Sequence, residues 1–167
     1  MKEKVNNRPK AITVLAALYI LGAGMGLLTL ASNLVSGSVN TESGTFAAIL
    51  VFGTSTMISF VTLFAGIDLL SGNIRGYILA NFYLVYNIFN DIATVIAIQY
   101  LNNQLVISQY ALRILLSIVI IVFLNYKTSL AYFKIKIEQI RSYMLMVAIV
   151  ALVLVVLVNG LYLLFAS

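Results

Sequence analysis

Two residue types that build most catalytic and metal sites are missing from this chain of 167 residues, which contains no cysteine and no histidine. Disulfides, Fe–S clusters, thiolate or imidazole zinc sites and haem held by Cys or His are therefore excluded. Nucleophilic mechanisms that depend on a histidine base are excluded as well. The five acidic residues include no close pair, and no phosphate-binding or metal-binding motif occurs. We expect a protein that is not an enzyme and holds no cofactor and no metal.

Charge is scarce too, since charged residues make up only 9% of the chain and hydrophobic residues 62%. Soluble domains carry roughly 25% charged residues. Five apolar stretches cover residues 11–35, 46–70, 77–101, 106–124 and 142–166. Each meets or approaches the ~20 residues that a helix needs to cross a bilayer. The sequence predicts an all-α polytopic transmembrane bundle of five helices in the cell membrane, with a basic tail at 1–10 and one domain over 11–167.

The distribution of Lys and Arg predicts how this bundle is oriented. Apart from Arg113 within the fourth stretch, these residues occur in the tail and in the connections at 71–76 and 125–141, whereas the connections at 36–45 and 102–104 contain none. Short cytoplasmic loops are enriched in Lys and Arg, so we expect the N-terminus inside and the C-terminus outside. The net charge of +5 is thus a topology signal and does not indicate nucleic acid as a partner. The first apolar run is about twice a signal-peptide core of ~7–15 residues, so we expect it to be retained.

Small residues recur at helical spacing in the first two stretches. The first contains a GxxxG pair, Gly22 and Gly26, and the second contains Ser55, Ser59, Thr62 and Gly66. Small residues allow helix backbones to approach closely in lipid. We expect these faces to pack the first two helices together, with self-association through one of them as the alternative.

The third stretch carries a polar stripe, formed by Tyr83, Asn87, Asn90, Asp91 and Thr94 within about a third of the helix circumference. The fourth stretch offers Gln109, Arg113 and Ser117 on one face. A short connection makes the two helices antiparallel neighbours, and the depths of Asp91 and Arg113 then differ by only ~5 Å.

We therefore predict an Asp91–Arg113 ion pair in the outer half of the bilayer, assisted by Asn87, Asn90 and Gln109. An ionisable group within a span usually faces the interior or a wet cavity. Two interpretations remain open for this cluster. It either fixes helix packing alone, or it lines a polar cavity for a solute, an ion or a proton.

Residues 126–141 connect the fourth and fifth stretches and show an amphipathic pattern. Its apolar face holds Leu130, Phe133, Ile137 and Ile140, and its charged face holds Lys127, Lys134, Glu138 and Arg141. We expect one amphipathic helix, lying in the interface or extending the fourth helix, whose basic residues favour anionic lipids at the inner face. A docking surface for a partner subunit is the alternative.

Two further polar residues have simpler interpretations. Asp68 is expected at the inner end of the second helix, close in sequence to Arg75, as an interfacial carboxylate. Asn159 is expected to form an interhelical hydrogen bond.

The opening Arg8-Pro9-Lys10-Ala11-Ile12-Thr13-Val14-Leu15-Ala16 resembles the start of many small, uncharacterised prokaryotic polytopic membrane proteins, in which an Arg-Pro leader runs into the first helix. Residues 66–80 are similar to their tight basic turn between the second and third helices. That turn often contains Trp, which this chain lacks, and the fifth helix extends beyond their four-helix pattern. The resemblance implies a membrane fold and assigns no functional residue.

Together these features predict a non-catalytic integral membrane protein that is a subunit of a larger membrane complex. Its expected partners are the lipid bilayer and either other membrane subunits or further copies of itself. The alternative is a small oligomeric transporter or channel that uses the Asp91 and Arg113 cluster.

Overall fold

The structure is a computed structural model, and it describes residues 8–36, 45–99 and 104–165. The described residues form six helices and no strand, which confirms the all-α prediction. They are α1 (Lys10–Ser36), α2 (Thr45–Ser71), α3 (Ile74–Gln99), α4 (Gln104–Leu124), α5 (Lys127–Tyr132) and α6 (Ile137–Phe165). Each predicted apolar stretch corresponds to one long helix, and α5 is an additional short one.

Four helices are long and apolar enough to cross a membrane, over Lys10–Val35, Ala48–Ser71, Ile107–Leu124 and Ile137–Tyr162. Four such helices indicate a multi-pass membrane protein. The long helix α3 is not among them, because it carries Asn81, Asn87, Asn90 and Asp91. Helices α2, α4 and α6 all pack on α3, so protein rather than lipid covers much of its polar surface.

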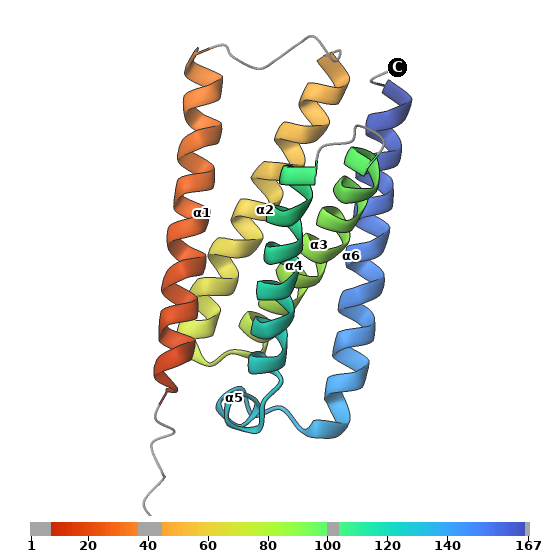
Figure 1. The fold of residues 1–167 in the computed structure, drawn as a ribbon. Helices are drawn as coiled ribbons and strands as arrows, with labels where there is room; N and C mark the ends of the chain where they lie inside the picture. The colour runs from red at the N-terminus through yellow and green to blue at the C-terminus, as the bar shows by residue number, and fades with distance from the viewer. Residues whose placement is uncertain (1–7, 37–44, 100–103, 166–167) are drawn as a thin grey trace, which may run out of the picture.

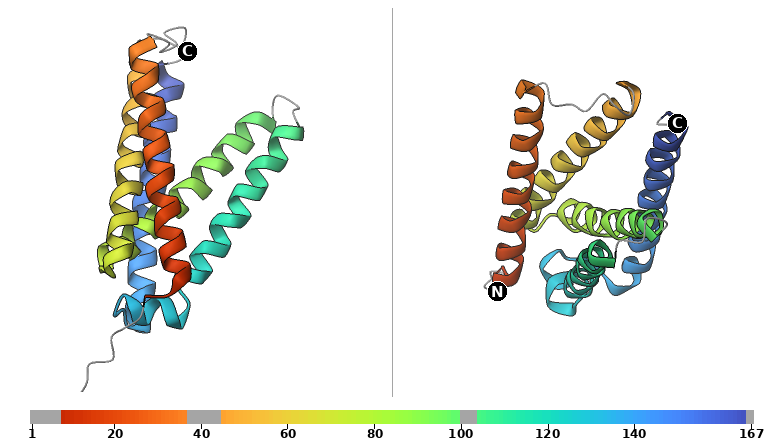
Figure 2. Two further views of the ribbon diagram at one scale, coloured as in Figure 1. Left: turned by 90° about the vertical axis from the view of Figure 1, so that its left-hand side faces the viewer. Right: turned by 45° about the horizontal axis from the view of Figure 1, so that its top comes forward.

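The five long helices alternate in direction, with α5 at the end of the bundle where α1 begins (Figure 1). In the side view of Figure 2, α3 and α4 lean away from α1, α2 and α6 towards the opposite end. The larger core cluster lies at the α5 end and includes Ile12, Leu69, Tyr77, Leu124 and Phe133, all at most 2% exposed. The bundle is therefore closed at one end and splayed at the other.

The connection between α4 and α6 differs from the prediction of one amphipathic helix over 126–141. Helix α5 ends after six residues, Lys134 has a positive φ of 57°, and α6 begins at Ile137. Leu130 and Phe133 are buried in the core, whereas Ile137, expected on the same face, is 67% exposed. The helix ends in a Schellman motif at Lys134, in which Ile135 N–H donates to Leu130 O at 3.0 Å, and Ile135 rather than Ile137 is then buried in the core. This break explains why six helices are present where five were expected.

Helices α1 and α2 pack through part of the small-residue pattern. A Cβ at Gly26 would lie 2.8 Å from Ser59 Oγ, and one at Gly66 would lie 2.7 Å from Ile20 Cγ1. Thr62 is buried between these levels. Gly22 has no such neighbour within 4 Å. The close contact within the chain thus involves Gly26 rather than the whole GxxxG pair.

Among the described glycines, Gly76 has the least room for a side chain, and the sequence patterns did not single it out. A Cβ at this position would lie 2.5 Å from both Asp68 C and Leu69 N on α2. Gly72, with a φ of +69°, forms the turn that brings α3 back onto α2. Because backbone atoms fill the space, no side chain at Gly76 fits without moving one helix.

We predict that Gly76→Ala lowers the free energy of unfolding by about 2 kcal/mol or more, at the upper end of the effects of overpacking. Thermal unfolding of the purified protein in detergent measures this loss. Gly22→Ala is the matched control, since its methyl group meets nothing and a helical Gly→Ala change favours the helix by up to ~1 kcal/mol. Equal effects of the two substitutions would contradict the predicted contact.

Candidate functional site

The structure brings the two predicted charges together, with Arg113 Nη2 of α4 lying 3.3 Å from Asp91 Oδ1 of α3. The two helices run antiparallel and pack on each other, so residues on either side of their short connection meet at matching depth. Asp91 lies eight residues before the end of α3, or ~12 Å along the axis.

The two partners lie in very different surroundings. The Asp91 side chain is 1% exposed, whereas that of Arg113 is 57% exposed. The Arg113 guanidinium also lies 5.5 Å from the ring centroid of Tyr110, within the range of a cation–π interaction. Within the described residues, neither carboxylate oxygen of Asp91 accepts a hydrogen bond. Arg113 is therefore the main compensation for this buried charge.

The expected assistance from Asn87, Asn90 and Gln109 is wrong, because none of them donates a hydrogen bond to Asp91. Successive helical residues differ by about 100° in direction, so Asn90 points away from its neighbour Asp91. Asn90 lines a cavity beside α2 and α6 instead. Gln109 is exposed on α4, and Asn87 is partly exposed.

Tyr83 belongs to a helix contact rather than to the ion pair. Its ring packs edge-on against Tyr19 of α1, with centroids 5.3 Å apart. The Tyr19 hydroxyl donates to the Ala80 carbonyl at 3.2 Å and ties α1 to α3. The polar stripe of α3 is thus divided among three neighbours, with Tyr83 facing α1, Asp91 facing α4 and Asn90 facing the cavity.

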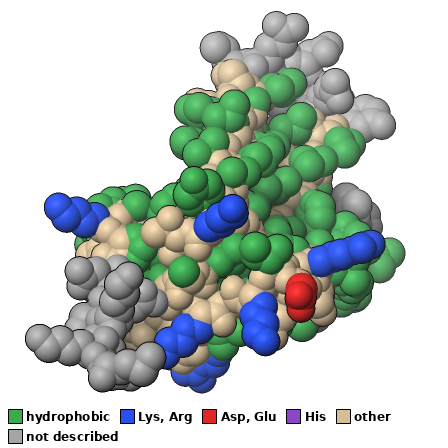
Figure 3. Space-filling model, turned by 90° about the horizontal axis from the view of Figure 1, so that it is seen from below, with side chains coloured by type: hydrophobic (Ala, Val, Ile, Leu, Met, Phe, Trp, Pro, Cys, Tyr) green, Lys and Arg blue, Asp and Glu red, His purple; other side chains and the backbone are tan. Residues whose placement is uncertain are grey.

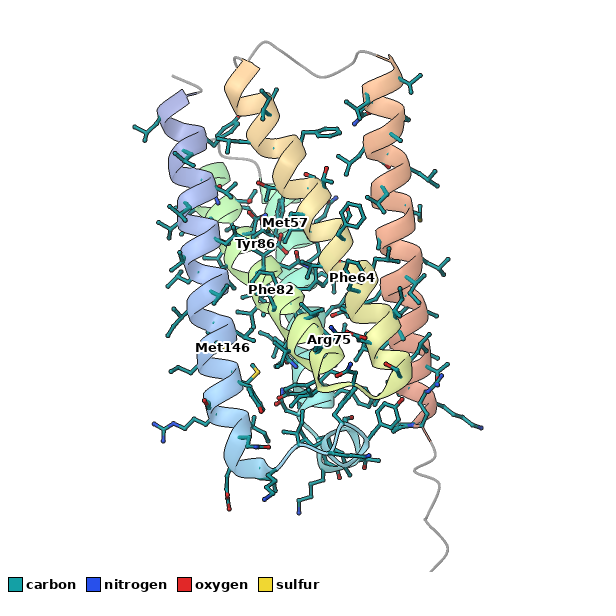
Figure 4. All side chains as sticks on the ribbon, turned by 180° about the vertical axis from the view of Figure 1, so that it is seen from behind. Met57, Phe64, Arg75, Phe82, Tyr86 and Met146 are labelled. Atoms are coloured by element: carbon teal, nitrogen blue, oxygen red, sulfur yellow. The ribbon has the colours of Figure 1, made fainter. Side chains whose placement is uncertain are left out.

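The cavity has a volume of about 300 Å³ and lies between α2, α3 and α6. Its walls are Leu50, Val51, Thr54 and Ser55 of α2, Tyr86 and Asn90 of α3, and Val158, Asn159 and Tyr162 of α6. Figure 4 shows Tyr86 between α2 and α6 in the view from behind. The interhelical hydrogen bond expected for Asn159 is wrong, since its amide donates to Val155 O of the same helix at 2.9 Å.

A second polar group, at the closed end, was missed by the sequence analysis. The Tyr77 hydroxyl donates to Asn125 Oδ1 at 2.6 Å, and the Asn125 amide donates to Ile121 O at 2.8 Å. The same amide lies 3.4 Å from Asn81 Oδ1, and the Asn81 amide donates to Tyr77 O at 2.9 Å. The spacing of Tyr77 and Asn81, four residues apart, was the available signal. This network joins α3 to the end of α4 and explains how Asn81 is tolerated at 0% exposure.

The closed end also carries the basic residues. Figure 3 shows Lys and Arg side chains distributed around this end when it is seen from below. Here Arg75 Nε lies 3.4 Å from Asp68 Oδ2, with Arg75 72% exposed. The Asp68 side chain is only 16% exposed, but Arg75 reaches solvent, which screens the pair and limits its contribution to stability.

No family model matches the chain, and neither a curated protein nor a solved structure is significantly similar to it. Among the described residues, no three His, Cys, Asp or Glu side chains group as metal ligands would. The functional argument therefore depends on the geometry of Asp91, Arg113 and the cavity.

We predict unequal losses for the two halves of the ion pair. Arg113→Gln leaves a buried carboxylate without compensation and should cost about 3 kcal/mol or more, as for other buried pairs that lose one partner. Asp91→Asn should cost less, because the remaining cation is more than half exposed. Unfolding free energies of the two single variants and the double variant in detergent measure the coupling.

The double variant should lose less than the sum of the single losses. Ser117→Ala, a buried position one turn further along α4, provides the control for general disturbance of this helix contact. Additive losses in the double variant would show that the 3.3 Å contact carries no interaction energy.

Proposed function

We propose that this protein is a non-catalytic membrane subunit that binds another transmembrane helix through the outer side of α4. The observation that carries this proposal is Arg113, a charged side chain that is 57% exposed within an apolar helix. An arginine at the centre of a span costs ~2.5–3.5 kcal/mol on insertion scales, so such residues generally face protein or a wet cavity.

The neighbours of Arg113 on α4 are apolar and exposed, with Leu112 59% and Leu116 51% exposed. Helix α4 packs mainly on α3 and contacts α5 at its inner end, which leaves most of its circumference without protein cover. Arg113 lies nine residues from the start of α4, or ~14 Å along the axis. A headgroup at the end of the helix is therefore distant, and a neighbouring helix is the nearer source of hydrogen-bond acceptors.

The chemistry of the guanidinium defines the partner. Arginine has five N–H donors, and the Asp91 contact involves one nitrogen. We propose that the partner helix is apolar and presents a carboxylate or amide oxygen in its outer half. Polar side chains that bond across helices are a recurrent means of association in lipid.

In this proposal α3 also crosses the bilayer, so that the chain has five spans, and the closed end faces the cytoplasm. The Lys and Arg residues at that end support this orientation through the positive-inside rule (Figure 3). The same residues would favour anionic headgroups at the inner face.

The absence of cysteine allows a direct test in native membranes. A single cysteine at Leu116 that carries a thiol-reactive benzophenone should cross-link to C–H bonds of a foreign membrane protein on illumination. Sequencing of the cross-linked peptide should identify an apolar span that contains an acidic or amide residue. Arg113→Gln in the same background should abolish this product, and Arg113→Lys should retain part of it because the charge remains.

Val153→Cys on α6 is the matched control, since Val153 is 51% exposed, as is Leu116. It should give no specific product. Equal cross-linking from α4 and α6, or a product unaffected by Arg113→Gln, would argue against the α4 interface. A product formed only between copies of this chain would replace the foreign partner with self-association.

One observation favours transport as a second candidate function. The Asp91 carboxylate accepts no hydrogen bond within the described residues, so a proton or cation would find unused acceptors there. If Asp91 carries a proton, a pH gradient should be dissipated several-fold faster in proteoliposomes with the unmodified chain than with Asp91→Asn. Asp68→Asn, which changes the carboxylate paired with Arg75 at the closed end, is the control, and equal rates for all three proteins would eliminate this candidate.

A further inference from the structure

The cavity between α2, α3 and α6 lies away from the α4 surface and has its own chemistry. Polar side chains from all three helices converge on it, namely Thr54, Ser55, Tyr86, Asn90 and Asn159. In hydrocarbon, polar groups require partners within the protein or in a bound molecule. What these groups bond therefore indicates what the cavity holds.

The helices themselves satisfy only part of this polar capacity. The Thr54 hydroxyl donates to Leu50 O at 2.7 Å, and the Asn159 amide nitrogen donates to Val155 O. The hydroxyl oxygen of Thr54 and the side-chain carbonyl oxygen of Asn159 can therefore still accept hydrogen bonds. The Tyr86 hydroxyl and the Asn90 amide form no hydrogen bond with other described residues. The cavity thus offers both donors and acceptors to a guest.

The guest must be neutral, because none of the nine residues that line the cavity is charged. A charged headgroup would lose its hydration there without a counter-charge. Leu50, Val51 and Val158 supply apolar wall beside the polar groups. The volume of about 300 Å³ is at the lower limit for small-molecule sites. A small polar headgroup together with the first part of an acyl chain matches this combination.

The cavity also reaches the side of the bundle. Two of its lining residues are substantially exposed, Val51 at 51% and Tyr162 at 37%. Figure 4 shows α2 and α6 on either side of Tyr86, with α3 behind. Because the outer surfaces of α2 and α6 are apolar, a guest would enter from the bilayer rather than from water.

We propose that this cavity binds a neutral hydroxylated amphiphile of the acylglycerol class, taken from the outer half of the bilayer. The glycerol hydroxyl and ester oxygens bond Tyr86, Asn90 and Asn159, and the acyl chain leaves past Val51. This site does not involve the α4 interface, so failure of either proposal leaves the other intact, and only its placement in the outer half rests on the proposed orientation.

The test uses the full chain in phosphatidylcholine nanodiscs with a diacylglycerol that carries a photoreactive diazirine on one acyl chain. A phosphatidic acid with the same chains and diazirine is the matched anionic probe. Diacylglycerol should label peptides covering residues 50–55 and 158–162 at least five-fold more than phosphatidic acid. Equal labelling by the two lipids, or labelling spread over α1 and α4, would overturn the proposal.

A substitution in the cavity links the labelling to Asn90. Asn90→Leu should reduce diacylglycerol labelling at least five-fold, because it removes a polar partner and fills part of the space. Asn87→Leu, on the same helix but outside the cavity, should leave labelling unchanged. Ser55→Leu provides a second cavity variant on α2 should Asn90→Leu fail to give a monodisperse protein.

Competition distinguishes a lipid from a soluble polyol with the same hydroxyl chemistry. Excess unlabelled diacylglycerol should suppress labelling, and glycerol alone should not. Suppression by glycerol would make a soluble polyol the guest and overturn entry from the bilayer. Labelling that neither competitor reduces would be non-specific and would overturn the proposal.

Discussion

The need to shield α3 from hydrocarbon governs how this bundle is built. Helix α3 carries Asn81, Asn87, Asn90 and Asp91, and it alone among the long helices is not apolar enough to qualify as a span by itself. Its neighbours α2, α4 and α6 are apolar and pack around it. The central position of α3 follows from this difference, since a polar helix is least costly where protein replaces lipid.

The two ends of α3 are shielded in different ways. At the closed end, Tyr77, Asn81 and Asn125 bond one another, and Leu130 and Phe133 close the core beneath them. At the splayed end, Asp91 meets one cation, and Asn90 faces a cavity that the helices leave unfilled. A fully bonded network stabilises a single arrangement, whereas an incompletely bonded region retains capacity for a ligand or a partner. Both proposed interactions therefore belong to the splayed half.

The number of long helices and the pairing of Asp91 with Arg113 could be predicted from the sequence. They depend only on the length of each apolar run and on the depth of a residue along its helix. Apolar run length located the five long helices, and counting residues from the short connection matched Asp91 with Arg113. The sequence could not predict how each helix is rotated about its own axis or how closely two helix backbones approach. Adjacent residues Asn90 and Asp91 share a stripe in sequence but face different helices, and the role of Gly76 depends on where α2 passes. The break after Phe133 likewise required knowledge of the core into which that ring fits.

The separation of Asp91 from the cavity bears on which function is the stronger proposal. The two features lie on different sides of α3, about 100° apart at adjacent residues, and Asp91 is 1% exposed. Asp91 does not line the cavity and is almost fully buried, so an ion could pass between them only if the packing around α3 changed, as in a rotation of that helix. Such a rotation would break the Asp91–Arg113 contact and, at the other end, the bonds that join Tyr77 and Asn81 to Asn125. Arg113, in contrast, already faces outward, so binding a neighbouring helix requires no rearrangement of the bundle.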